Sequence, residues 1–278
     1  MNHPDTVLDC ADLSLSRGRR LEQTRVVDGV SFELRRAHTL AVMGATGSGK
    51  SSLVSALAGS PSSDVRISGG RAHVLGVSIR AGGRARKKMA SAVGYVPQSA
   101  GAKLSARLTA ADLIAEPVVS RSRKVNRRAL DVKVVSLLDE LMLPIGTGEK
   151  FPFELSSGTR QRVAFARALI EEPLVFIGDE PFANMDVDAR RAASEALIQR
   201  RDEYGMSTLL VAHEADVVAR SDAAVVGLRA GHMVAAGPSL DELTWTPGLP
   251  PEHRHVVLSR PTSEILLPHL DSNQEPID

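Results

Sequence analysis

The chain of 278 residues holds a single cysteine, Cys10, so it cannot form an internal disulfide. One thiol in a chain of this size is typical of a reducing compartment such as the cytoplasm. The sequence also lacks any apolar run near the roughly 18 residues that span a bilayer, and its first residues lack the basic and apolar regions of a signal peptide. We therefore expect a soluble chain that reaches a membrane only through a partner chain.

Neither sign of charge is in excess, because 34 Lys and Arg stand against 33 Asp and Glu, for a formal net charge of +1. This balance gives no support to a nucleic acid as the main partner, so none is expected. Residues 80–88 form a basic run that could contact phosphate or lipid. Charged side chains are exposed by default, so we interpret the run as a solvated helix face.

What the sequence does contain is a glycine-rich stretch at residues 44–51 that fits the pattern G-x-x-x-x-G-K-[ST] of a phosphate-binding loop. Its glycines let the backbone point successive N–H groups at an anion. An apolar run before it and a helical run after it supply the strand–loop–helix context, which a glycine-rich linker would lack. We assign nucleotide binding to Gly44, Ala45, Thr46, Gly47, Ser48, Gly49, Lys50, Ser51 and Ser52, with Lys50 facing the β- and γ-phosphates and Ser51 on Mg²⁺.

A second apolar run, residues 174–178, ends in the carboxylates Asp179 and Glu180. We expect Asp179 to hold the Mg²⁺ shell and Glu180 to polarise the attacking water as general base. Two acids could close a buried strand by chance, but a phosphate-binding loop in the same chain favours the catalytic interpretation.

Residues 155–162, Leu-Ser-Ser-Gly-Thr-Arg-Gln-Arg, are similar to the LSGGQ-x-Q-R signature of the ABC ATPases. Gln98 stands where that family has its glutamine loop, residues 181–186 match its D-loop, and His213 ends a predicted strand as the family's switch histidine does. Taken alone, His213 would more often be structural and Gln98 an ordinary loop residue. Five elements in the family's order make the resemblance specific, and it covers residues 5 to 240.

Alternating strands and helices predict an α/β fold with a mostly parallel sheet. The resemblance implies a P-loop NTPase core with an N-terminal antiparallel β subdomain and an inserted α-helical subdomain. We divide the chain into a nucleotide-binding core at 1–100, the helical subdomain at 101–155, the second half of the core at 156–242 and an extension at 243–278. In the nucleotide-binding core, residues 59–70 are expected to form a loop. In the helical subdomain, Thr109 is expected to cap a helix that stops at Pro117.

The resemblance also implies a head-to-tail dimer with ATP between the subunits. Ser156 and Gly158 of one chain would complete the phosphate site of the other, and Asp186 would lie at the same interface. Gln98 would join Ser51 at Mg²⁺ and link the site to the helical subdomain. Catalysis would rest on Glu180, His213 and Lys50.

The function implied is that of an ATP-binding and ATP-hydrolysing subunit that powers a membrane transporter. The sequence of residues 153–163 most resembles that of peptide and nickel importer ATPases, which favours import of peptides or other small solutes. Partners would be separately encoded transmembrane permease subunits, a second ATPase subunit (the same or a different chain) and an extracytoplasmic substrate-binding protein. The chain would sit on the cytoplasmic face of the cell membrane.

The alternative is a soluble ABC ATPase of DNA repair, chromosome structure or translation. The interval between Lys50 and Ser156 has room for a helical subdomain but not for a long coiled-coil arm, and there is one ATPase domain. Both favour transport. A third possibility is a nucleotide-binding regulatory module that does not hydrolyse ATP. Such a module would lack the catalytic carboxylate, but Glu180 is present.

Two departures from the family's pattern affect the site. Leu21 stands at the position that usually carries an adenine-stacking aromatic, so we expect weaker base recognition. The signature has Ser157 for its first glycine and Thr159 for its glutamine. Serine is small and threonine can cap a helix start, so we expect a working site.

Overall fold

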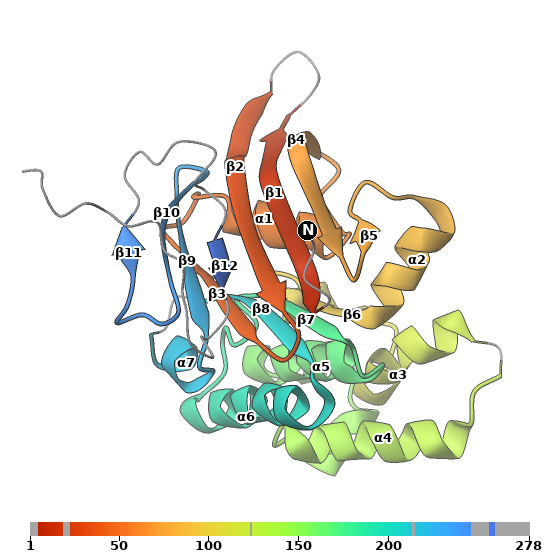
Figure 1. Ribbon diagram of the computed structural model, residues 1–278. Helices are drawn as coiled ribbons and strands as arrows, with labels where there is room; N and C mark the ends of the chain where they lie inside the picture. Colours follow the sequence, from red (N-terminus) through yellow and green to blue (C-terminus); the bar gives the residue numbers. More distant parts are fainter. Residues whose placement is uncertain (1–4, 19–22, 123, 213–214, 246–255, 259–278) are drawn as a thin grey trace, which may run out of the picture.

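The computed structural model describes residues 5–18, 23–122, 124–212, 215–245 and 256–258, which form two sheets with helices between and around them (Figure 1). In the first sheet, β1 pairs antiparallel with β2 on one side and with β4 on the other. The strand order is β12-β2-β1-β4-β5. The strands are β1 (Thr6–Arg17), β2 (Thr24–Arg35), β4 (Val65–Val74), β5 (Val77–Ser78) and β12 (Val256–Leu258), the last parallel to β2.

The second sheet has the order β11-β10-β9-β3-β8-β7-β6, and its strands from β9 to β6 pair in parallel. Every residue of β7 and β8 is buried, as expected of parallel strands covered on both faces. The predicted α/β fold with a mostly parallel sheet and an N-terminal antiparallel sheet is confirmed. The strands are β3 (Thr39–Met43), β6 (Val93–Val96), β7 (Val175–Asp179), β8 (Ser207–Val211), β9 (Ala224–Arg229), β10 (His232–Gly237) and β11 (Thr244–Trp245).

Successive side chains of β7 point to opposite faces of its sheet and enter two different cores. Val175 and Ile177 join the core that contains α1 and the antiparallel sheet, whereas Phe176 packs in the core built by the larger helices. Figure 1 shows α5 and α6 beneath the parallel strands, with α3 and α4 beside them. The helices are α1 (Lys50–Leu57), α2 (Gly83–Ala92), α3 (Ala110–Arg121), α4 (Arg127–Glu140), α5 (Ser157–Leu169), α6 (Val187–Tyr204) and α7 (Ala215–Arg220), with 3-10 turns η1 (Ala100–Lys103), η2 (Ile145–Glu149) and η3 (Pro152–Glu154).

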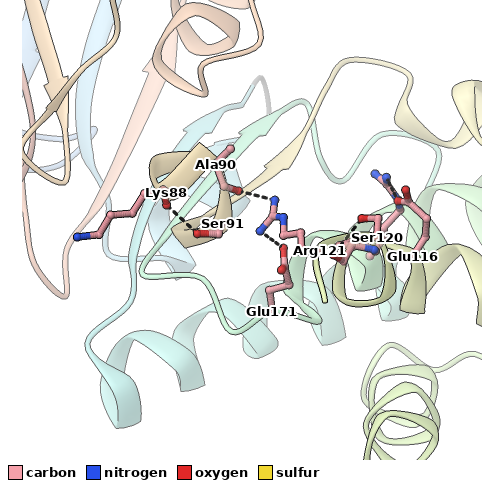
Figure 2. A network of polar contacts seen from close by, with 9 residues as sticks. Lys88, Ala90, Ser91, Glu116, Ser120, Arg121 and Glu171 are labelled. Atoms are coloured by element: carbon pink, nitrogen blue, oxygen red, sulfur yellow. Dashed lines mark hydrogen bonds and ion pairs between the residues drawn. The ribbon is translucent and has the colours of Figure 1, made fainter. Parts of the chain in front are cut away.

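The helix α3 does not stop at Pro117 as predicted, but continues to Arg121. Contacts with α5 and with the residues that follow it lie on both sides of the proline, where Glu116 pairs with Arg167 and Arg121 pairs with Glu171, each at 2.5 Å. Arg121 also donates to the carbonyl of Ala90 at 2.8 Å (Figure 2). The fixed φ of proline suits a helix, so packing carries α3 through it at the cost of one backbone hydrogen bond.

The prediction of loop for residues 59–70 is wrong at its end, because residues 65–70 belong to β4. The reason is tertiary, since β1 supplies the hydrogen-bonding ladder and Leu15 lies opposite Ile67. In the described part of the chain, no helix is long and apolar enough to cross a membrane. The boundaries at residues 100, 155 and 242 stay a prediction.

Candidate nucleotide site

The loop between β3 and α1 is a tight turn that its glycines make possible. Gly44, Gly47 and Gly49 have φ angles of 143°, 82° and 102°, a region that residues with a side chain rarely adopt. A Cβ on Gly44 would also overlap the carbonyl oxygen of Leu228, and one on Gly49 that of Val26. Space and backbone conformation therefore both require glycine at these two positions.

The loop closes around Lys50, whose side chain is only 5% exposed. Its Nζ donates to the carbonyl oxygens of Gly44 at 2.6 Å and Ala45 at 2.9 Å. Burial lowers the pKa of Lys50, while the nearby carboxylates of Glu180 and Asp179 act in the opposite sense. A lysine held this way is a fixed positive charge at the start of α1, where the helix dipole also favours an anion.

Asp179 is the last residue of β7 and is buried beside the loop. The Ser51 hydroxyl donates to its Oδ1 at 3.1 Å. Burial raises the pKa of Asp179, opposed by this hydrogen bond and by the charges of Lys50 and Lys103, with Glu180 adding to the rise. A hydroxyl and a carboxylate thus face one another at the end of the loop.

Glu180 follows Asp179 with a φ of 52°, a strained conformation for a residue with a side chain. Its N–H donates to the carbonyl of Val211 at 3.2 Å, which turns the chain at the end of the strand. The amide Nε2 of Gln98 donates to Glu180 Oε1 at 3.3 Å, and Lys103 Nζ donates to the Gln98 carbonyl at 2.8 Å. The structure therefore gathers the predicted Lys50, Ser51, Gln98, Asp179 and Glu180 at one edge of the parallel sheet.

Three predicted residues lie apart from this group. Ser156 caps α5, its Oγ accepting from the Thr159 N–H at 3.1 Å, and Asp186 caps α6 by accepting from the Ala189 N–H at 2.8 Å. A Cβ on Gly158 would lie 2.5 Å from the Asn184 carbonyl oxygen, so the start of α5 packs closely on the segment after Glu180. Among the described residues, no hydrogen bond or ion pair joins Ser156, Gly158 or Asp186 to the loop at 44–51.

His213 and Leu21 lie outside the described residues. Ser52, assigned to nucleotide binding from the sequence, is buried, and its Oγ accepts from the Arg17 guanidinium at 3.2 Å. This contact ties α1 to the antiparallel sheet. Thr46 and Gly47 lie at the exposed tip of the loop.

The sequence did not reveal the part played by Gln161, which is 1% exposed. Its Oε1 accepts from the Gly101 N–H at 3.1 Å and its Nε2 donates to the Pro181 carbonyl at 3.0 Å. It thereby joins the segment after Gln98 to the segment after Glu180. The available signal was a polar residue on the same helical face as the apolar Phe165, four residues on.

The site suits a bound phosphate and a magnesium ion. The Ser48 Oγ is buried without a hydrogen-bond partner among the described residues, as expected of a loop shaped for an anion. No group of three or more His, Cys, Asp or Glu in the described ranges could hold a metal alone. Mg²⁺ commonly takes one or two protein oxygens and completes its shell with phosphates and water, which matches the Ser51 hydroxyl and the Asp179 carboxylate.

The family model described as ABC transporter matches residues 27–183, more than half of the chain. The chain belongs to the ABC transporter family. It is 33% identical over 224 residues to the oligopeptide transport ATP-binding protein OppD of Mycobacterium tuberculosis, covering 80% of this chain and 35% of that protein. It is 34% identical over 216 residues to a putative peptide import ATP-binding protein of Brucella abortus, covering 77% and 63%. It is 30% identical over 251 residues to the oligopeptide transport ATP-binding protein OppF of Escherichia coli, covering 90% and 72%.

The chain of this ABC transporter family member thus spans about a third of the first relative and less than two thirds of the second. Among solved structures, the dimeric ATP-binding cassette MJ0796 bound to ADP and Pi superposes with a TM-score of 0.75 at 20% identity, covering 87% of this chain and all of that one. The cassette cbiO1 from Clostridium perfringens gives 0.67 at 24% identity, covering 84% and 89%. At these identities the likeness shows the fold.

Proposed function

We propose that the chain is the ATP-binding and ATP-hydrolysing subunit of a membrane transporter that imports peptides or other small solutes. The observation that carries the proposal is the convergence of the Lys50 amine, the Ser51 hydroxyl and the Asp179–Glu180 carboxylates at a loop shaped for phosphate. The three relatives are all oligopeptide or peptide transport ATP-binding proteins by name, which supports peptide import over DNA repair or translation.

Each residue has a chemical part in this proposal. Lys50 holds the β- and γ-phosphates, the N–H groups of residues 44–51 donate to them, and Ser51 with Gln98 and Asp179 holds Mg²⁺. When bound, Mg²⁺ neutralises charge on the phosphate oxygens. Glu180 accepts the proton of the attacking water, and the Gln98 amide positions its carboxylate. His213 is proposed to assist at the same centre.

The site needs a second ATPase subunit in this proposal. Among the described residues, no hydrogen bond joins Ser156 or Gly158 to the loop of their own chain, which supports this requirement. Head-to-tail pairing would bring the signature of one subunit to the phosphates of the other. Transmembrane permease subunits and an extracytoplasmic substrate-binding protein would complete the importer. The chain would act on the cytoplasmic face of the membrane, with no nucleic acid partner.

The ATPase part of the proposal is tested by phosphate release from the purified chain with MgATP. Lys50→Ala should abolish ATP binding because the phosphates lose their fixed countercharge, whereas the exposed Lys124→Ala should not. Glu180→Gln should bind ATP but turn over about 10²–10⁴-fold more slowly. Unchanged ATP affinity in Lys50→Ala, or normal turnover in Glu180→Gln, would contradict the assignment.

The transport part predicts that permease genes neighbour this reading frame, and it is tested in cells that express those genes together with the chain. The tagged chain should co-purify with those permease subunits, and Glu180→Gln should abolish uptake of a labelled oligopeptide without weakening co-purification. Peptide uptake that persists in Glu180→Gln would show that this chain does not power it.

A further inference from the structure

One sector of the chain is rich in positive charge and contains no acid. Residues 65–111 hold nine of the 34 Lys and Arg and none of the 33 Asp and Glu, in a chain whose net charge is only +1. The nearest acids in the sequence are Asp64 and Asp112, on either side of the sector. The near-neutral total therefore conceals a strongly uneven distribution, which the basic run at 80–88 only partly reveals.

In the structure most of this sector forms one flank, made of β4, β5 and α2, and these elements lie side by side in Figure 1. Met89 is the one buried residue of α2. Its cations Arg84, Arg86, Lys87 and Lys88 are all exposed. Arg66, Arg71 and Arg80 add exposed cations from the strands and the turn beside it.

These cations are not neutralised by neighbouring carboxylates. In the described structure none of the four on α2 forms an ion pair, and Arg86 instead donates to the carbonyl of Gly59 at 2.6 Å. Two exposed acids, Asp5 and Asp12, lie on or just before β1, which pairs with β4. Among the other acids of adjoining elements, Asp64 pairs with Arg17 and Glu171 pairs with Arg121, and Asp9 Oδ2 lies 3.3 Å from the Nδ1 of His73.

The helix α2 is held against its neighbours by its buried Met89 and by two hydrogen bonds, one from Arg121 and one from its own Arg86. Arg121 of α3 donates to the carbonyl of Ala90, and the Ser91 hydroxyl donates to the carbonyl of Lys88 at 2.7 Å. Figure 2 shows the Lys88 side chain pointing away from this network. The helix that carries these cations is therefore fixed in position against α3.

Apolar side chains lie next to the same flank. A cavity of about 420 Å³ opens beside α2, and its lining includes Lys88, Met89 and Leu174. Among the described residues, Asp5 is the acidic side chain of this lining. Leu174 is 48% exposed. A surface that presents cationic side chains next to apolar ones is the kind that binds the headgroup region of an anionic bilayer.

We propose that the flank formed by β4, β5 and α2 binds the anionic phosphate headgroups of a membrane surface. The inference rests on the proposed function in that it assumes a chain that works at a membrane. Leu174 precedes β7, whereas Asp179 and Glu180 end that strand, so the flank's cavity and the nucleotide site lie at opposite edges of the sheet. Nucleotide and lipid can therefore bind together. Residues 65–94 hold no Phe, Trp or Tyr on which bases could stack, which favours lipid over single-stranded nucleic acid.

The test is co-sedimentation of the full chain with vesicles of phosphatidylcholine containing about 30% phosphatidylglycerol, and with vesicles of phosphatidylcholine alone. Wild type should bind the anionic vesicles only, and salt should weaken the binding. Arg84→Gln with Lys87→Gln removes two exposed charges for which the described part of the chain shows no hydrogen bond or ion pair. At about fivefold per charge near the surface, the partition coefficient should fall roughly 30-fold.

The matched control is Lys124→Gln with Arg128→Gln, which removes one lysine and one arginine exposed near the start of α4. It should bind anionic vesicles like wild type. Equal binding to both kinds of vesicle, no binding by wild type, or an equal loss in the control would overturn the proposal. So would displacement of the vesicles by a single-stranded oligonucleotide at equal phosphate concentration. ATP hydrolysis without vesicles should be the same in all three proteins, so lost vesicle binding with intact hydrolysis would leave the proposed function standing.

Discussion

At the residue scale, Asp179 is a carboxyl that is only 2% exposed and lies beside the phosphate-binding loop. Burial raises its pKa, and the hydrogen bond from Ser51 only partly offsets this. A carboxyl whose pKa is higher in the folded than in the unfolded chain binds its proton more tightly when folded. The free energy of unfolding therefore falls as pH rises from the unfolded pKa through the folded one.

Asp179→Asn should accordingly raise the thermal midpoint of the nucleotide-free protein at neutral pH, because the amide carries no charge to desolvate. The advantage should shrink as pH is lowered toward about 4, the value of an unperturbed aspartate. Calorimetry from pH 5 to 8 checks this, with the exposed Asp241→Asn as control. Adding MgATP should reverse the order, since wild type binds it more tightly through the Mg²⁺ contact of Asp179. A wild type more stable than the variant without nucleotide would contradict the argument.

Thr159, which stands where the family's signature has glutamine, changes the hydrogen bonds of a single neighbouring residue, Ser156. Its hydroxyl lies 2.8 Å from the Ser156 Oγ, which already accepts from the Thr159 N–H. The Ser156 hydroxyl is thus occupied twice within its own subunit, at the position proposed to meet the partner's phosphate.

Thr159→Val removes the competing hydroxyl and keeps the branched shape. It should lower the KM for ATP by roughly fivefold, the value of one neutral hydrogen bond. Steady-state ATPase assays measure this, with Ser156→Ala as the variant that loses the interaction altogether. A higher KM in Thr159→Val would mean that the threonine hydroxyl holds Ser156 in its productive orientation.

Motifs disclosed most of the site but not its internal connections. Lys50, Ser51, Asp179 and Glu180 were predicted because their chemistry needs fixed spacings along the chain. Gln161 was missed because its two partners, Gly101 and Pro181, come from segments that only the fold brings together. Its place on the helical face of Phe165 is a sign of burial, but it does not identify the two partners.

At the scale of elements, the start of α5 packs so closely on the segment after Glu180 that only glycine fits at position 158. Gly158→Ala should therefore destabilise the protein by about 1–3 kcal/mol, because the Asn184 carbonyl must move. Gly146→Ala is the matched control, since a Cβ there meets no atom within 4 Å. Chemical denaturation of both variants measures the difference, and equal stability would show that the two segments separate freely.

Helix starts that depend on neighbouring residues in the sequence were predicted well. Segments whose structure depends on packing against distant parts of the chain were not. Thr109 caps α3 as predicted, because the signal for a cap lies within a few residues of it. The far end of α3 was missed because its continuation past Pro117 depends on contacts with α5 and the residues after it. The first half of β4 was missed because Gly69 and Gly70 read as loop until β1 pairs with them.

At the scale of the whole molecule, the fold separates the proposed signature from the loop it would serve. Phosphate-binding and carboxylate residues gather at the ends of β3 and β7. Ser156 and Gly158 instead lie at the start of α5, where Gly158 packs on Asn184 in the segment before α6. A chain that paired with a second copy would therefore build each active site from the loop of one subunit and the signature of the other.

Mixing two inactive variants tests this arrangement. Lys50→Ala has a defective loop and an intact signature. Ser156→Asp keeps a residue that can cap α5 and has an intact loop, but it places a carboxylate at the position proposed to meet the partner's phosphates, so neither variant should hydrolyse ATP alone. In a mixed dimer, one of the two sites combines the intact loop with the intact signature. Equal mixing makes half of the dimers mixed, so about a quarter of wild-type activity should return. Lys50→Ala mixed with Glu180→Gln is the control, because every site then has a defective loop or a defective carboxylate. Activity that stays at zero in the first mixture would show that the active site is not shared between copies of this chain, and its partner would then be a different ATPase subunit.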